Sequence, residues 1–388
     1  MEFELSPEQK ALRDKAREFV EKECFPLEST WPMSDYDAPP ELVKELQRKL
    51  TEYGFRGLAI PKEAGGQGKG TLAKCLVREQ LNRSFVLMGG TLTYGVFIDP
   101  HHALYTAPDY QKEKYLYPVI RGEKIYHFCY SEPESGSDIA AMKTSALKDG
   151  DNYTINGIKM WSPDPTRQYL KADYFTVYAV TDPGKGYNGI SVFLVDSDTP
   201  GLRVVKRMKT ISPNTLLGDV SVLAFENCSV PSSNLLGKEN AGFKSGLNQL
   251  NRNRIVISAG SLGIAQRCLD MAIDYAKKRV TFNKPIAERQ AIQWMLVDSA
   301  MELQMARLLV YHAAWKLDQD EDTRMEAAMS KAFCPEIACR VIDRTMQIFG
   351  GLGMLAETRL GSIYSFERIA RVAEGTGEMM RHISRVAY

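Results

Sequence analysis

A carboxylate near the C-terminal end of the chain has the surroundings of a catalytic base. Glu374 lies in the sequence A-E-G-T of residues 373–376, beside a glycine that lets the backbone pass close to a ligand. A glycine-bearing run, residues 347–353, precedes it and could approach a phosphate group. A base within reach of such a turn predicts redox chemistry on a bound organic cofactor. The alternative at this point is an exposed glutamate at the start of a helix, where negative charge is favourable.

Composition argues against several other kinds of function. The chain of 388 residues has a formal net charge of +1, which gives no global field to attract nucleic acid. Its seven cysteines contain no Cys-x-x-Cys pair and its five histidines are scattered, so we expect reduced thiols and no metal site. No apolar stretch is long enough to span a bilayer, and residues 1–5 carry acids where a secretion signal would carry bases. We therefore expect a cytoplasmic protein.

The elements that must position Glu374 fall into regions of different periodicity. Residues 1–123 show helical spacing of apolar side chains, starting from a capping box at Ser6 with proline at the first helical position. Residues 124–236 hold short β-branched and aromatic runs separated by turn residues, which predicts an antiparallel sandwich or barrel. Residues 237–388 are helical again and predict a four-helix bundle. The predicted fold class is α+β, with a β domain between two helical domains.

A long apolar helix is expected in the C-terminal region. The chain has neither glycine nor proline between Pro285 and Pro335. Met295, Met301 and Met305 fall near its apolar stripe, and we expect them to fill the core. Such a helix packs in a bundle or against another subunit. The stripe consists of Ile292, Leu296, Leu303, Ala306, Val310 and Ala313.

Five motifs in order along the chain resemble those of the acyl-CoA dehydrogenases, flavoproteins of the butyryl- and medium-chain type. The resemblance covers nearly the whole chain. Each motif is weak alone, but five motifs in the right order and spacing argue against a chance match. The motifs are IPKEAGGQG at residues 60–68, SEPESGSD at 131–138, NGIKMW at 156–161, RVTF at 279–282 followed by Gln290, and AEGT at 373–376.

This resemblance implies FAD-dependent dehydrogenation of an acyl-CoA thioester to a 2-enoyl-CoA. Glu374 matches the family's base, which removes the α-proton while the β-hydrogen leaves as hydride to flavin N5. Burial beside the flavin would raise the pKa of the carboxyl, and the backbone N–H of Glu374 would bind the developing enolate oxygen. The family also implies an electron-transfer flavoprotein as acceptor and a homo-oligomer, a tetramer built as a dimer of dimers.

The same match implies residues that hold the cofactor and the substrate. Arg279 would pair with the FAD diphosphate of a neighbouring subunit, because its fork of donors suits phosphate. Trp161 would cover one flavin face. Without the family context these residues have plain structural explanations: Ser131 and Ser137 as turn serines, Trp161 as a buried tryptophan at a strand end, and Arg279 as a solvated arginine. The set implied for FAD is Phe128, Tyr130, Ser131, Ser137, Trp161, Ser162, Arg279, Phe282, Gln290, Gln347, Gly350, Gly351, Thr376 and Glu378. The set implied for the acyl-CoA is Ser137, Asn251, Arg254, Glu374 and Gly375.

The chain departs from the family pattern at two places that concern the site. Ser162 and Pro163 follow the tryptophan where the family usually has an apolar residue and then a threonine whose hydroxyl reaches flavin N5. Asn253 stands where some relatives carry the base, so no second carboxylate competes with Glu374 there. Residues 99–102 (DPHH) either line the acyl pocket or form an interhelical turn. Three other functions stay open: an enoyl-CoA reductase or an oxidase on the same fold, and a flavin-free helical interaction protein.

Overall fold

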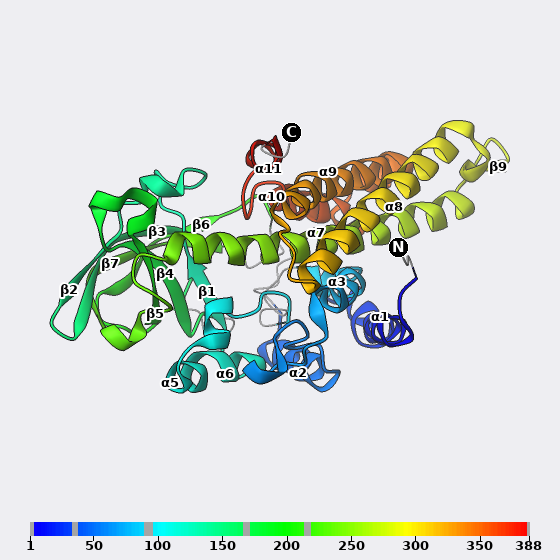
Figure 1. Ribbon diagram of the computed structural model, residues 1–388. Helices are drawn as coiled ribbons and strands as arrows, with labels where there is room; N and C mark the ends of the chain where they lie inside the picture. The colour runs from blue at the N-terminus through cyan, green and yellow to red at the C-terminus, as the bar shows by residue number, and fades with distance from the viewer. Residues whose placement is uncertain (1–3, 33–37, 89–95, 166–170, 213–218, 386–388) are drawn as a thin grey trace.

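The computed structural model describes residues 4–32, 38–88, 96–165, 171–212 and 219–385, so residues 1–3 of the acidic N-terminal segment lie outside it. The chain runs from helices through a β-rich region to long helices, as the sequence predicts (Figure 1). The β-rich region lies at one end of the molecule, and the long C-terminal helices extend away from it.

The N-terminal helices pack beneath the long C-terminal helices (Figure 1). The predicted capping box is present, since Ser6 Oγ accepts from the backbone N–H of Gln9 at 3.2 Å and Gln9 Oε1 accepts from the N–H of Ser6 at 2.9 Å. The third helix, α3, is buried on most sides because it packs against both α7 and α8 of the C-terminal region. The helices are α1 (Pro7–Phe19), α2 (Pro40–Glu52), α3 (Gly70–Leu81), α4 (Phe85–Met88), α5 (Asp109–Gln111) and α6 (Tyr117–Ile120).

The middle region forms one mixed sheet in the order β1-β4-β2-β3-β7-β6, with β5 paired to β4. Most pairings are antiparallel, but β1 and β2 pair with β4 in parallel, so the prediction of a purely antiparallel arrangement needs this correction. The chain leaves β1, turns and returns through β2 and β3 before β4, and this longer path allows the parallel pairing. The strands are β1 (Tyr126–Cys129), β2 (Ser145–Asp149), β3 (Asn152–Pro163), β4 (Tyr174–Val180), β5 (Ile190–Asp196), β6 (Leu202–Lys209) and β7 (Asp219–Pro231).

Strand β3 continues through two irregularities instead of ending at a turn. Its pairing with β7 shifts register between Ile155 and Gly157 and again between Met160 and Ser162. The second shift leaves Trp161 between two paired residues with a φ of 68°, a left-handed conformation that is rare outside glycine. The bulge turns the indole outward, and Trp161 is 56% exposed.

The helix α7 (Gly242–Lys278) connects the β-rich region to the far end of the molecule (Figure 1). Its 37 residues span about 55 Å at the usual helical rise. It packs against α3, α8, α9 and β5, so it links the three regions. The remaining elements are β8 (Val280–Thr281), β9 (Lys284–Pro285), α8 (Gln290–Asp318), α9 (Arg324–Phe349), α10 (Leu360–Ala370) and α11 (Gly377–Ser384).

The helix α8 is apolar on two faces. Leu303, Ala306, Val310 and Ala313 of the predicted stripe are buried in the core, while Ile292 and Leu296 are half-buried. Met295 is also half-buried, but Met301 and Met305 are 59% and 50% exposed, so the prediction that they fill the core was wrong. They belong to an exposed apolar stripe, called here the outer α8 face, which comprises Trp294, Val297, Met301, Met305, Leu308 and Trp315.

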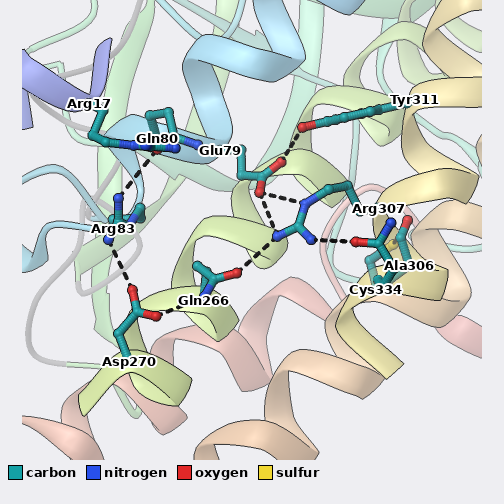
Figure 2. A network of polar contacts seen from close by, with 11 residues as sticks. Arg17, Glu79, Gln80, Arg83, Gln266, Asp270, Ala306, Arg307, Tyr311 and Cys334 are labelled. Carbon is teal, nitrogen blue, oxygen red and sulfur yellow. Dashed lines mark hydrogen bonds and ion pairs between the residues drawn. The ribbon is translucent and has the colours of Figure 1, made fainter. Parts of the chain in front are cut away.

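A buried polar network ties α3 to the C-terminal helices (Figure 2). Glu79 on α3 is 3% exposed, and it accepts hydrogen bonds from Arg307 Nε at 2.9 Å and from the hydroxyl of Tyr311 at 2.6 Å. Arg307 also donates through Nη2 to Gln266 Oε1 of α7 at 3.0 Å. A buried carboxylate is tolerated because these donors replace its water.

Candidate active site

Glu374 sits on a strained turn between α10 and α11. Its φ is 58° and that of Gly375 is 105°, so two consecutive residues adopt left-handed backbone conformations. The φ of Gly375 explains the glycine at this position, because side chains rarely tolerate that conformation. Thr376 follows as the N-cap of α11, and its hydroxyl accepts from the N–H of Met379 at 3.2 Å. The turn is therefore held in place by the start of the last helix.

Two buried cations hold the carbonyl groups of this turn. Arg254 of α7 donates through Nε to the carbonyl oxygen of Glu374 at 2.9 Å, and Lys331 of α9 donates through Nζ to that of Gly375 at 3.2 Å. The exposed fractions of Arg254 and Lys331 are 5% and 1%. Burial lowers the pKa of Lys331 to about 8, an effect that nearby Glu374 partly offsets. Strained conformations persist where surrounding contacts over-determine them, as these do.

The carboxyl group of Glu374 is buried although the residue as a whole is partly exposed. Its Oε2 is buried and has no hydrogen-bond partner among the described residues, while Oε1 accepts a long bond of 3.4 Å from Asn253 Nδ2. Burial raises the pKa of this carboxyl to about 7, against the opposing effects of Arg254, Asn253 and Lys331. A carboxylate with an unused oxygen and a pKa near neutrality is suited to accept a proton.

A chain of amides fixes the orientation of Asn253 toward the base. The side chain of Gln249 donates through Nε2 to Asn253 Oδ1 at 3.0 Å, and its own Oε1 accepts from the backbone N–H of His102 at 2.9 Å. With its oxygen occupied, Asn253 presents its NH₂ group to Glu374. Asn253 thus supplies a donor that favours the ionised form of Glu374.

A second buried carboxylate lies behind the turn. Glu367 of α10 is 1% exposed, and the hydroxyl of Ser261 donates to its Oε1 at 2.5 Å. Burial raises the pKa of Glu367 to about 8, with Ser261 and Lys331 acting in the opposite direction.

Sequence reasoning missed Lys331 and Glu367. The available signal was a charged residue on the otherwise apolar face of a helix, such as Lys331 beside Ala327, Ala328 and Cys334.

The residues predicted to hold the flavin ring lie near the outer end of β3 and in the loop after β1. Ser137 and Trp161 are exposed and Ser131 is half-buried, with the carbonyl of Ser131 accepting from the N–H of Met160 at 2.9 Å. Ser162 is different, because it is buried and its hydroxyl shares a 3.2 Å hydrogen bond with Cys129 Sγ. The hydroxyl of Ser162 is therefore engaged within the β-rich region.

Two predicted cofactor residues, Thr376 and Glu378, lie at the start of α11 beside Glu374, and six others lie at the other end of α7. The hydroxyl of Tyr275, near the end of α7, is 3.5 Å from the carbonyl of Phe349, and the two rings stack with centroids 4.3 Å apart. Arg254, which holds Glu374, precedes Tyr275 on the same helix by about 30 Å. Residues 347–353 are thus far from Glu374, and the prediction that base and glycine turn come within reach was wrong for a single chain. The same end carries Arg279, Phe282, Gln290, Gln347, Gly350 and Gly351, all exposed.

Apart from Ser137 in the loop after β1, the predicted substrate residues lie on α7 and around the turn. Asn251 Oδ1 accepts from Arg254 Nη1 at 2.9 Å, so both side chains face the turn of Glu374. Of residues 99–102, Asp99 pairs with Lys74 at 2.6 Å and His101 lines a cavity that Asn253 also lines. Phe128 and Tyr130 line that cavity too. In the part of the chain that the structure describes, no cluster of three metal-ligating side chains occurs and no helix is long and apolar enough to cross a bilayer.

Comparison with known proteins places these features in context. Three family profiles match the chain: the acyl-CoA dehydrogenase N-terminal domain over residues 6–123, the middle domain over 127–228 and the C-terminal domain over 240–387. The chain is 36% identical over 376 residues to a 3-(aryl)acrylate reductase of Clostridium sporogenes, covering 96% of each chain. It is 31% identical to the butyryl-CoA dehydrogenase structure of Megasphaera elsdenii, with a TM-score of 0.89 and coverage of 100% of this chain and 99% of that one. A chain in a structure of the electron transferring flavoprotein of Acidaminococcus fermentans is 34% identical, with a TM-score of 0.90 and coverage of 100% and 99%.

Proposed function

This chain belongs to the acyl-CoA dehydrogenase family, and we propose that it removes hydrogen from the α- and β-carbons of an acyl-CoA thioester with Glu374 as the base. The observation that carries this assignment is the carboxyl of Glu374, whose Oε2 is buried without a partner among the described residues. Burial brings its pKa to about 7, so a large part of the protein holds the ionised form at neutral pH. General bases work best in this range.

The chain's own residues account for the handling of the α-proton. The thioester carbonyl makes that proton weakly acidic, and the ionised carboxylate of Glu374 takes it. Arg254 and Lys331 hold the two carbonyls of the turn, so the carboxylate does not have to be ordered during the reaction. The backbone N–H of Glu374 would bind the negative charge that develops on the thioester oxygen. Asn253 keeps a donor on Oε1 throughout.

The exposed groups of this chain fit an FAD shared between two subunits. Trp161 presents a largely exposed indole, and the neighbouring Met160 is bonded to Ser131, whose segment also carries the exposed Ser137. These residues would supply an apolar face and hydroxyl donors for a flavin ring. Arg279 and residues 347–351 lie at the far end of α7 and would hold the diphosphate and adenosine of a neighbouring subunit's cofactor. When bound, FAD supplies the acceptor for the hydride that leaves the β-carbon. Phe282 supports a cross-subunit contact, because it projects 90% exposed from the β8–β9 hairpin.

The outer α8 face supports a homo-oligomer, and the family pattern favours a tetramer built as a dimer of dimers. Six large apolar side chains that are each about half exposed form a stripe along one helix. Contiguous apolar surface of this kind marks an interaction site, and a second copy of the chain would cover it.

The same site could run as a dehydrogenase that passes electrons to a carrier protein, as an enoyl-CoA reductase or as an oxidase. We favour an electron-transfer flavoprotein as acceptor, supported by the similarity to the Acidaminococcus chain. The Clostridium relative is named as a reductase, and a pKa near 7 would also let protonated Glu374 deliver a proton to an enoyl-CoA. The same residues therefore serve either direction, and a rapid reaction with oxygen would instead indicate an oxidase.

Replacing the base gives the direct test. Glu374→Gln should keep FAD and acyl-CoA binding but lose most of the reduction of flavin by acyl-CoA, because the amide cannot accept the proton. Flavin absorbance is followed without oxygen, and Glu45→Gln on the exposed face of α2 is the matched control. Near-normal reduction in Glu374→Gln would assign the base to another residue. Purified protein that stays colourless after addition of FAD would refute every flavoenzyme assignment.

A further inference from the structure

A row of hydrogen bonds connects the N-terminal helical region to the catalytic base. Asn253 Nδ2 donates to Glu374 Oε1 at 3.4 Å, and Asn253 Oδ1 in turn accepts from Gln249 Nε2 at 3.0 Å. Gln249 Oε1 accepts from the backbone N–H of His102 at 2.9 Å. Gln249 and Asn253 are one helical turn apart on α7, and each is only 6% exposed. The row therefore lies away from water, where its bonds are strong.

The backbone N–H of His102 sets the direction of this row. An N–H group can only donate, so the atom of Gln249 that faces it must be the amide oxygen. The imidazole adds a second donor to the same oxygen, since His102 Nδ1 lies 3.2 Å from it. The NH₂ group of Gln249 is then left for the oxygen of Asn253, and the NH₂ group of Asn253 is left for Glu374. One main-chain donor thus orients two amides in turn.

An amide beside the base can favour or disfavour its ionised form. In the observed orientation, Asn253 donates to the carboxylate of Glu374 and lowers the pKa of that group. Rotated by half a turn about its last side-chain bond, the amide would instead direct its oxygen at Glu374 Oε1, and the two oxygens would repel each other. The oxygen and the NH₂ group are similar in size, so packing alone does not select one orientation. The bond from Gln249 makes that selection.

The other groups around the base act in one direction whatever their orientation. Arg254 of α7 and Lys331 of α9 carry donors and no acceptor, and both favour the ionised carboxyl. Tyr130, which follows β1, and Tyr178 of β4 also interact with the carboxyl, and burial raises the pKa of both phenols, so they stay neutral. Among the described residues, only Asn253 hydrogen-bonds to the carboxyl oxygens, so the orientation of its amide has a direct effect on the base.

We infer that Gln249 and the main chain at His102 are positioning residues for the proton-transfer step, because they hold the NH₂ group of Asn253 toward Glu374. The inference rests on the proposed function, since it takes Glu374 as the base. Loss of the row should disfavour the ionised carboxyl and raise its pKa. The acid limb of kcat/KM, which is the pH range where the rate falls as the base takes up protons, should then move to higher pH.

Gln249→Met tests the side-chain link with little change in length. The acid limb for flavin reduction by acyl-CoA should move up by about half to one pH unit, which lowers kcat/KM at pH 6 by about three- to tenfold. Asn248→Met, at the neighbouring exposed position of α7, is the matched control. In an Asn253→Ala background, Gln249→Met should cause no further movement, because Gln249 acts through that amide.

His102→Pro and His102→Ala isolate the main-chain donor. Both remove the imidazole, but only proline removes the backbone N–H. The backbone tolerates proline here, because His102 is the first residue of the short 3₁₀ helix His102–Thr106, and His101 has a φ of −51° and a ψ of 127°, which suit a residue before proline. The acid limb should move up in His102→Pro and move less in His102→Ala.

Infrared difference spectra against Glu374→Gln give a readout that needs no turnover, because the carbonyl stretch of the protonated carboxyl follows its titration. The midpoint should move in the same direction as the acid limb, with FAD absorbance confirming an intact site. An unmoved limb and midpoint in both Gln249→Met and His102→Pro would overturn the inference and leave the proposed function standing, and so would an equal shift by Gln249→Met in the Asn253→Ala background. Turnover that survives Glu374→Gln would refute the proposed function together with the inference.

Discussion

Lowering the pH from 8 to 6 should slow removal of the α-proton about tenfold, because Glu374 must be ionised to act as a base. Burial raises the pKa of its carboxyl to about 7. A group with this pKa is ionised in about ten molecules of eleven at pH 8 and in about one of eleven at pH 6. A carboxyl with the ordinary value would be ionised over the whole interval, and the rate would stay constant.

The assay is stopped-flow reduction of the bound flavin by acyl-CoA without oxygen, at substrate concentrations well below saturation. Under these conditions kcat/KM reports the pKa of the free enzyme. Lys331→Met tests the electrostatic origin of that value. The Lys331 cation favours the ionised form of Glu374, so its loss should raise the pKa and move the acid limb of the profile to higher pH. Lys331→Arg keeps a cation and should shift the limb less.

A flat profile between pH 6 and 8 in the wild-type enzyme would refute the assignment of Glu374 as a base with a neutral pKa. Movement of the limb to lower pH in Lys331→Met would show that the cation does not act on Glu374 as described. Flavin content and the dissociation constant for acyl-CoA, measured in each variant, identify any loss of the site itself.

Three further predictions concern stability and assembly. Burial raises the pKa of Glu367 from 4.5 to about 8, so the folded protein binds one more proton than the unfolded chain between these pH values, and its stability falls as the pH rises through them. Glu367→Gln should therefore make the decrease of Tm with pH less steep, and an unchanged slope would contradict this prediction. Arg307→Met leaves Glu79 buried without its cation and should lower the free energy of unfolding by about 3 kcal/mol in denaturant titrations, whereas a neutral result would show that Tyr311 suffices. Met301→Glu on the outer α8 face should reduce the oligomer mass in sedimentation experiments, and an unchanged mass would place the interface elsewhere.

Local patterns in the sequence predicted the order of the regions correctly, and they also led to the proposal of Glu374 as the base. The capping box at Ser6 and the strands β4 and β5 depend on neighbouring residues, so their patterns are legible without a structure. The turn at Glu374 was marked by its following glycine. In contrast, the parallel pairing of β1 with β4 joins segments more than forty residues apart, and periodicity contains no information on strand direction.

Other features depended on distances that no local pattern encodes. Helical spacing showed that α8 is apolar, but it does not distinguish a face in the core from a face for another chain, and Met301 and Met305 were misplaced for that reason. The glycine run at residues 347–353 is close to Glu374 in sequence, yet α10 returns along the bundle between them. Lys331 and Glu367 meet the site only through packing of α9 and α10.

Under the proposed assembly, the length of α7 predicts that two inactive variants of the chain complement each other. Glu374 is held by Arg254, well inside α7, and Arg279 follows the end of that helix, so the two residues of one chain would serve different sites. When one chain lacks the base and its neighbour lacks the diphosphate contact, both defects therefore fall in one site of the mixed oligomer. Two inactive chains, Glu374→Gln and Arg279→Ala, could therefore complement each other when expressed together, since one of the sites formed between them receives intact residues from both. Under the proposed assembly, each complete catalytic site would therefore require two chains.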